Sequence, residues 1–262
     1  MSFDGVPQTK LIRKVTLVRG EIPRPEEKDR LLRLSVYTLT FSIPSKASVQ
    51  NPAIPHASIQ IDLGDVVKMV IPGYKPKSYS VSGLRENEFD ITFKAYPNGR
   101  ASGFLDRLQV GDTIQSFGKS ANRIRNPGRF VGIIVFGVGI TEGLPIAEAE
   151  LEKEDAERVV LLWACRTFGD YFWDDKVDEL VKKYGEKFRI ERIMSRDSHV
   201  GCLHGRINHD ILEQVFQPPT KESARFLSVG TKEMMFSTYL MLAELGYIMP
   251  RNALLPKRNE VY

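Results

Sequence analysis

The chain has 262 residues, 42% of them hydrophobic and 27% charged, which is typical of globular proteins and sufficient for two domains of about 130 residues. The net charge of +4 is too small for a nucleic-acid-binding protein and favours an acidic partner or a phosphate-bearing ligand. The two cysteines exclude a disulfide framework, and no apolar stretch reaches the ~18 residues of a membrane helix. We therefore expect a protein of the cytoplasm or another reducing compartment, with no targeting signal and no transmembrane segment; the oligomeric state and organelle stay open.

The first half of the chain contains short runs of β-type residues separated by Gly, Pro, Asn and Asp. These runs are 11–20, 31–41, 66–71, 77–83, 89–96 and 112–117. Many short strands with turn signals predict an antiparallel β-barrel or sandwich. Residues 42–60 contain three prolines and little periodicity, and predict a long loop between two strands.

After residues 125–129, apolar strands alternate with amphipathic helices. The expected strands are 130–136, 158–164, 187–194 and 224–230, and the expected helices are 144–153, 174–184, 208–216 and 232–246. This alternation predicts a doubly wound parallel α/β sheet, with domains at 1–128 and 129–262. Ligands of such sheets bind beyond the carboxyl ends of the strands. If the first and last strands are neighbours, the loops 137–143 and 228–235 face one cleft.

The stretch "FGVGITEG" places two glycines between a strand and a helix. Gly137 and Gly139 would let the backbone approach a pyrophosphate, which the N-terminus of the helix attracts. The spacing differs from G-x-G-x-x-G, and the acid Glu142 follows the glycines closely. The alternative is a tight turn that binds nothing.

Two further stretches, in the first half, indicate a phosphate-bearing ligand with a flat ring. In "PKSYSVSG", Lys77 would meet a phosphate, Tyr79 would stack on a ring and Ser80 would donate a hydrogen bond. In "NGRASG", Arg100 and the backbone N–H groups of a helix start would form an anion site, with Ser102 as the expected N-cap. The alternatives are a solvated strand and a capped surface helix.

In this order the motifs resemble the ferredoxin–NADP reductase superfamily, and in particular the flavin module of nitrate reductase and related NADH-dependent reductases. The flavin motif R-x-Y-[S/T] of that family corresponds to residues 77–80, and G-[K/R]-x-S corresponds to 99–102. The loop G-x-G-I-T-P corresponds to 137–142, and C-G-P-x-x-M to 229–234. The resemblance covers roughly residues 10–250. It implies a β-barrel that binds FAD, followed by an α/β domain that binds NADH or NADPH.

The resemblance also implies roles for individual residues. Lys77 and Arg100 would pair with the FAD phosphates, Tyr79 would lie against the flavin, and Ser80 would approach its reactive nitrogen. Ser80 and Thr141 are the residues expected to take part in catalysis. The other expected cofactor-binding residues are Thr92, Lys94, Tyr96, Gly99, Ala101, Ser102, Gly137, Val138, Gly139, Arg166, Asp170, Ser195, Arg196, Gly230 and Met234. No metal site is expected.

Four positions depart from the family pattern. Lys77 replaces an arginine and cannot form the bidentate hydrogen bonds with phosphate that arginine forms, so we expect weaker binding of FAD. Glu142 and Thr231 each replace a proline, and Val229 replaces a cysteine, so three departures cluster where nicotinamide would sit.

The choice between the two nucleotides is left open by the sequence. Asp170 favours NADH, because an acid near this point accepts the ribose hydroxyls. Arg166, Ser195 and Arg196 favour the 2′-phosphate of NADPH.

The leading hypothesis is an FAD-dependent NAD(P)H oxidoreductase that passes electrons onward, for which an acidic electron-acceptor protein would suit the basic charge. The second is a flavin-binding homologue with impaired hydride transfer and a binding or regulatory role. The third is a scaffold without a cofactor.

Overall fold

The computed structural model describes residues 6–21, 32–43, 61, 65–119 and 127–249. The chain divides into two compact units, residues 1–123 and 124–262. The predicted loop at 42–60 lies almost wholly outside the described residues.

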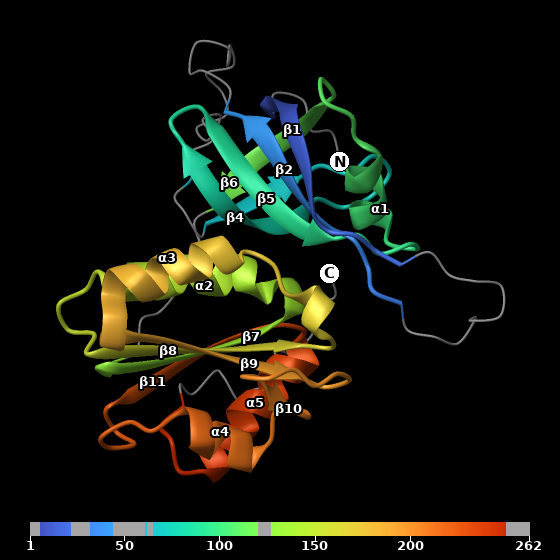
Figure 1. The fold of residues 1–262 in the computed structure, drawn as a ribbon. Helices are drawn as coiled ribbons and strands as arrows, with labels where there is room; N and C mark the ends of the chain where they lie inside the picture. Colours follow the sequence, from blue (N-terminus) through green and yellow to red (C-terminus); the bar gives the residue numbers. More distant parts are fainter. Residues whose placement is uncertain (1–5, 22–31, 44–60, 62–64, 120–126, 250–262) are drawn as a thin grey trace. The chain divides into compact units, whose positions relative to one another are not determined.

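The first unit is a closed antiparallel barrel with the strand order β1-β2-β5-β4-β3-β6 (Figure 1). Its elements are β1 (Gln8–Val18), β2 (Val36–Ser42), β3 (Val66–Met69), β4 (Lys77–Arg85), β5 (Glu88–Lys94), α1 (Arg100–Arg107) and β6 (Thr113–Lys119). Alternate side chains point inward and fill the barrel, where Phe41 stacks on Phe89 at 5.6 Å between ring centroids. Leu105 of α1 joins this core, so the barrel packing fixes the helix and the segment that leads into it.

The barrel is closed by its first and last strands. Gln8, Thr9 and Lys10 of β1 pair with Gln115, Ile114 and Thr113 of β6. The buried Thr9 hydroxyl donates to the carbonyl of Ile114 at 3.1 Å and accepts from the Ser116 hydroxyl at 3.2 Å. The closure therefore depends on contacts between residues more than 100 positions apart in the chain.

The second unit is a five-stranded parallel sheet with the order β10-β9-β8-β7-β11. Its strands are β7 (Phe130–Phe136), β8 (Arg158–Cys165), β9 (Phe188–Met194), β10 (Leu203–His204) and β11 (Ala224–Val229). Its helices are α2 (Ile140–Leu151), α3 (Asp174–Tyr184), α4 (His209–Val215) and α5 (Lys232–Glu244), with short 3-10 turns at Gly137–Gly139, Phe168–Asp170 and Gly185–Lys187. Figure 1 shows α2 and α3 on one face of the sheet and α4 and α5 on the other.

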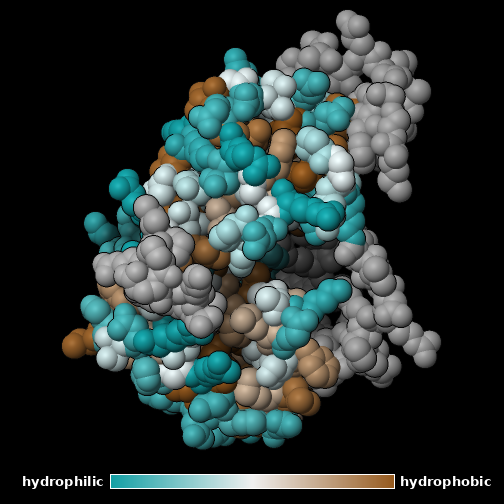
Figure 2. Space-filling view, turned by 90° about the vertical axis from the view of Figure 1, so that its right-hand side faces the viewer, coloured by the Kyte–Doolittle hydropathy of each residue, from teal (hydrophilic) through white to brown (hydrophobic). Residues whose placement is uncertain are grey.

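The predicted fold class, an antiparallel barrel followed by a doubly wound parallel sheet, is confirmed. β7 is buried along almost its whole length, as a central parallel strand must be when helices cover both faces. The surface is mixed: on the face drawn in Figure 2, hydrophilic side chains predominate and hydrophobic ones lie between them. None of the helices built from described residues is long and apolar enough to cross a membrane.

Candidate functional site

In the barrel, Lys77 and Arg100 gather around one aromatic ring. Lys77 begins β4 and Arg100 begins α1, yet the Lys77 ammonium lies 5.2 Å and the Arg100 guanidinium 5.4 Å from the ring centroid of Tyr74. The N-terminus of α1 adds its own partial positive charge, and no side chain caps it. Two cations and the first N–H groups of a helix in one place suit a ligand with two phosphates.

The turn into α1 explains why the segment at 99–102 contains glycine and serine. A Cβ at Gly99 would collide with the Ser102 hydroxyl oxygen, so glycine leaves the space that this oxygen occupies. That oxygen accepts a hydrogen bond from the Tyr96 N–H at 3.1 Å. The prediction that Ser102 is the N-cap is wrong: Gly99 is the N-cap, and Ser102 lies in the first turn and ties the helix to the end of β5. Ala101 is buried beside it.

Tyr79 and Ser80 lie near the start of β4, opposite Val67 and Val66 of β3. The Tyr79 ring is half-buried and contacts Phe93 edge to face at 6.1 Å. Burial raises the pKa of Tyr79 to about 12, so its hydroxyl stays protonated at neutral pH. Tyr79 therefore offers a neutral ring with a hydrogen-bond donor, which suits contact with a flat heterocycle.

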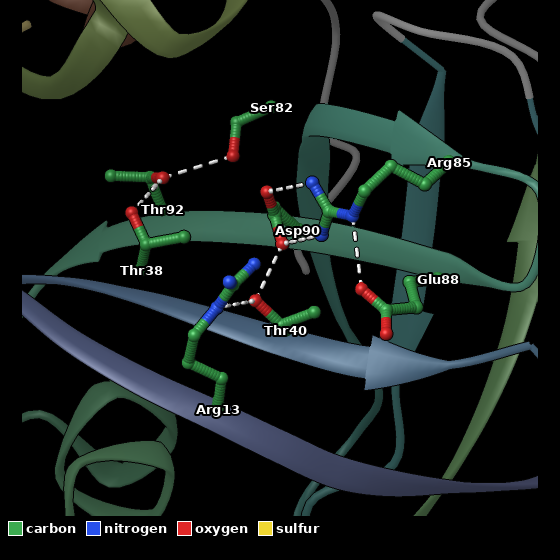
Figure 3. Close-up of polar contacts among 8 residues, drawn as sticks. All are labelled: Arg13, Thr38, Thr40, Ser82, Arg85, Glu88, Asp90 and Thr92. Atoms are coloured by element: carbon green, nitrogen blue, oxygen red, sulfur yellow. Dashed lines mark hydrogen bonds and ion pairs between the residues drawn. The ribbon is translucent and has the colours of Figure 1, made fainter.

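Thr92 belongs to a chain of three hydroxyl groups across neighbouring strands (Figure 3). Its hydroxyl lies 2.8 Å from that of Thr38 and 2.9 Å from that of Ser82. Thr92 is buried, whereas Lys94 is half-buried at the end of β5 and Tyr96 beyond it is 54% exposed. Exposure to solvent therefore increases along the chain from Thr92 through Lys94 to Tyr96, the three residues expected to flank the cofactor.

The barrel also holds a polar cluster that the sequence analysis did not identify. Asp90 of β5 accepts hydrogen bonds from Arg85 at 2.6 Å and 3.1 Å and from the Thr40 hydroxyl at 2.7 Å (Figure 3). A Cβ at Gly83 would collide with the Asp90 carboxylate, so glycine leaves the space for it. Burial would raise the pKa of Asp90, but the hydrogen bonds from Arg85 and Thr40 outweigh it and hold the pKa below its usual value.

In the second unit, the glycine turn and the end of β11 lie side by side. β11 pairs with β7 as far as Val229 opposite Val135, so the first and last predicted strands of this sheet are neighbours. A Cβ at Gly139 would lie 2.8 Å from the Val229 carbonyl oxygen, so only glycine fits this approach. Gly137 has a φ of 54°, in the left-handed region that glycine adopts without strain. Gly137–Gly139 is a 3-10 turn, and α2 begins at Ile140, earlier than predicted.

Two of the four departures from the family pattern, Glu142 and Thr231, lie at the starts of α2 and α5. Glu142 is in the first turn of α2, where a negative charge interacts favourably with the helix dipole. Thr231 is the N-cap of α5 and accepts from the Met234 N–H at 3.3 Å, so it replaces a proline with a capping hydroxyl. Gly230 packs against Phe136, and the Met234 side chain is exposed.

The carboxyl ends of β8 and β9 bring three predicted residues together. The Ser195 N–H donates to the Cys165 carbonyl at 3.1 Å, and the Arg196 N–H donates to the Arg166 carbonyl at 2.9 Å. The backbones of Arg166 and Arg196 are therefore neighbours at this edge of the sheet. Asp170 is buried, and its carboxylate accepts from the N–H and the hydroxyl of Thr167 at 3.2 Å and 3.0 Å.

An exposed aromatic pair at the same edge was missed by the sequence analysis. Phe168 stacks on His199 with 3.8 Å between ring centroids and 10° between the planes. Histidine and phenylalanine 31 positions apart carry no local signal of this contact, and only the fold places them together.

Comparison with known proteins matches this architecture to oxidoreductases. Residues 133–239 match the family model described as oxidoreductase NAD-binding domain. The NADH-cytochrome b5 reductase 1 of Mycosarcoma maydis is 27% identical over 217 residues, covering 80% of this chain and 65% of the relative. This chain thus spans less than two thirds of the length of that relative.

Solved structures share the two-unit fold. The cytochrome b5 reductase domain of Ulva prolifera nitrate reductase superposes with a TM-score of 0.68 and 16% identity, over 94% of this chain and 95% of that one. A ferredoxin NADP+ reductase from Neisseria gonorrhoeae, solved with bound FAD and NADP, gives a TM-score of 0.70 and 19% identity, over 95% and 94% of the two chains. At these identities the likeness concerns the fold.

Proposed function

We propose that this chain, in which residues 133–239 match an oxidoreductase NAD-binding domain and the two-unit fold is that of a solved ferredoxin NADP+ reductase, is an FAD-dependent NAD(P)H oxidoreductase that passes electrons from a nicotinamide cofactor through flavin to an acceptor. The observation that carries the proposal is the gathering of Lys77 and Arg100 at the uncapped start of α1. Bound FAD would supply the chemistry, accepting a hydride and releasing electrons one at a time.

In the barrel, Lys77, Arg100 and the N–H groups of residues 100–102 in the first turn of α1 would hold the FAD pyrophosphate. The protonated Tyr79 would lie against the ring system, and Ser80, three positions after Lys77, would donate to the reactive nitrogen. Thr92, Lys94 and Tyr96 would flank the cofactor along β5. Thr92 is buried, and its hydrogen bonds with the hydroxyls of Thr38 and Ser82 would fix the orientation of its own hydroxyl.

In the second unit, the turn at residues 137–139 and Thr141 would bind the pyrophosphate of the nucleotide. Gly230 and Met234 would lie at the nicotinamide end, and Arg166, Ser195 and Arg196 at the adenosine end. The carboxylate of Asp170 already accepts two hydrogen bonds from Thr167, which favours a role in shaping this loop. The two arginines suit NADPH, whereas the relative from Mycosarcoma maydis is named for NADH.

The acceptor that we propose is an acidic electron-carrier protein in a reducing compartment. The net charge of +4 favours association with an acidic surface, and the relative from Mycosarcoma maydis is named for cytochrome b5. The rate of electron transfer to such a carrier should fall steeply with ionic strength, because steering by charge is screened by salt.

The test is an anaerobic absorption spectrum of the purified yellow protein, titrated with NADH and NADPH in parallel. Bleaching of the flavin band by either nucleotide supports the oxidoreductase. A second candidate, a flavin-binding homologue with impaired hydride transfer, is favoured by Glu142, Val229 and Thr231 at the nicotinamide end. It predicts a bound flavin that neither nucleotide reduces, and a colourless protein would contradict both candidates.

We expect Glu142→Gln to tighten nucleotide binding severalfold. A carboxylate in the first turn of α2 repels an arriving pyrophosphate, and after screening this repulsion is worth about 1 kcal/mol. The measurement is stopped-flow flavin reduction against nucleotide concentration. Glu148→Gln removes the same charge from the same helix further along and should leave the half-saturating concentration unchanged. An unchanged value for Glu142→Gln would show that this carboxylate points away from the nucleotide.

A further inference from the structure

Trp163 lies under the glycine turn and holds it by a hydrogen bond. Trp163 is 0% exposed and is the third residue from the end of β8, and its indole Nε1–H donates to the Gly137 carbonyl at 2.8 Å. Tyr171 and Phe172 contact the indole edge to face, with ring centroids at 4.9 Å and 5.5 Å. The Tyr171 hydroxyl in turn donates to the carbonyls of Trp163 and Ile193. The two rings therefore hold the indole by packing, whereas the Tyr171 hydroxyl bonds only to backbone carbonyls of β8 and β9.

The carbonyl that Trp163 holds is part of the turn that leads into α2. Gly137 O also accepts from the Ile140 N–H, so two donors fix its direction. The next carbonyl, of Val138, accepts from the Thr141 hydroxyl at 2.9 Å. Both carbonyls of the turn thus point toward the protein.

The orientation of these carbonyls determines where the N–H groups of the turn point. In a planar trans peptide the C=O and N–H groups point in opposite directions. The N–H groups of Val138 and Gly139 share their peptide planes with the two held carbonyls, so they point away from Trp163 and Thr141. Gly137 has a left-handed φ of 54° and Gly139 a right-handed φ of −58°, so the backbone changes hand within the turn, and turns of this kind can present successive N–H groups to an anion.

We propose that Trp163 is a positioning residue for the pyrophosphate of the pyridine nucleotide: its indole N–H fixes the Gly137 carbonyl and thereby aims the Val138 and Gly139 N–H groups at the ligand. This inference rests on the proposed function of the second unit. Trp163 is buried and acts through the turn, without contact with the nucleotide.

The variant that tests this is Trp163→Phe, which keeps an aromatic ring and removes the N–H donor. Loss of one hydrogen bond that orients the turn should raise the Kd for NAD+ and NADP+ about tenfold. Binding is measured by calorimetry on the full chain, where no flavin reduction is involved. The rate of flavin reduction at saturating NADH or NADPH should change less than twofold, because the defect is in phosphate binding.

The matched control is Tyr171→Phe, which removes a donor from the same aromatic cluster without touching the turn. It should lower Tm and leave the Kd unchanged. An unchanged Kd in Trp163→Phe, or an equal rise in both variants, would overturn the inference, since the second result would mean that general loosening weakens binding. A wild-type protein that binds neither nucleotide would overturn the proposed function and this inference together.

A second measurement needs no variant that might misfold. In the wild-type protein, saturating NAD+ should slow hydrogen exchange of the Trp163 indole proton severalfold, because the bound pyrophosphate stabilises the turn that this proton holds. The chain has two tryptophans, and the indole of Trp173 serves as the internal reference. Binding of NAD+ without slower exchange at Trp163 would overturn the inference even if Trp163→Phe does not fold.

Discussion

Replacing Lys77 and Arg100 together with alanine is expected to release FAD while the barrel stays folded. Both side chains lie over the Tyr74 ring, and neither belongs to the barrel core. Each charge-assisted hydrogen bond to phosphate contributes about 1.5–3 kcal/mol, so the double substitution should weaken binding roughly 10²- to 10⁴-fold. The measurement is the ratio of flavin to protein absorbance after purification, together with a titration of the stripped protein with FAD.

The control for this experiment removes the same number of positive charges from residues near β4 and in α1 that are not expected to contact FAD. Lys75 precedes β4 and Arg107 ends α1, so Lys75→Ala/Arg107→Ala leaves the net charge equal to that of the test variant. It should retain FAD, which separates local phosphate binding from a general effect of charge. Undiminished flavin content in the Lys77/Arg100 variant, with an unchanged Tm, would mean that the cofactor is held elsewhere.

Asp90→Asn is expected to lower the free energy of unfolding of the barrel by about 2 kcal/mol at pH 7, because it removes charged hydrogen bonds from a largely buried carboxylate. The Tm of the barrel should fall by several degrees, as measured by calorimetry. Glu88→Gln removes the other partner of Arg85, which is more exposed, and should have a much smaller effect.

The effect of Asp90 should also depend on pH. The pKa of Asp90 is lower in the folded state than in the unfolded state, where it is about 3.9. Its contribution to stability is therefore fully present above the unfolded pKa and is lost as the pH falls through the folded pKa. The difference in Tm between wild type and Asp90→Asn should be constant from pH 7 to about pH 5 and shrink below about pH 4. A difference that persists at low pH would mean that the charge of Asp90 is not its source.

The strands of both units could be predicted because the order of apolar and polar residues in each strand matches the way the strand is buried. The barrel strands are short and bounded by turn residues, and α3 spans residues 174–184 as its amphipathic pattern indicates. β10 has two residues, too few for any periodicity. The start of α2 was placed too late, because residues 137–143 were expected to form a loop, whereas Gly137–Gly139 form a 3-10 turn that continues into the helix at Ile140.

The candidate site was predictable where it depends on neighbouring residues, as at 77–80, 99–102 and 137–141. It was not predictable where it depends on strand register. Asp90 meets Thr40 only because β2 and β5 pair residue 40 with residue 90. Trp163 reads as one more apolar residue of a buried strand, and its bond to Gly137 spans 26 positions. Ser102 was misplaced because a serine at a helix start resembles an N-cap, whereas the steric fit of Gly99 decides where the helix begins.

The closure of the barrel by β1 and β6 has a consequence for synthesis on the ribosome. β6 lies between β1 and β3, so a nascent chain that ends before residue 113 leaves the hydrogen-bonding edges of both strands unpaired. At a translation rate of 5–20 residues per second, roughly 5–20 s pass between the synthesis of β1 and that of β6. Two open edges during that interval are templates for pairing with other chains. Slow translation before residue 113 should therefore increase aggregation of nascent chains, whereas a pause after residue 119 has left the ribosome should not.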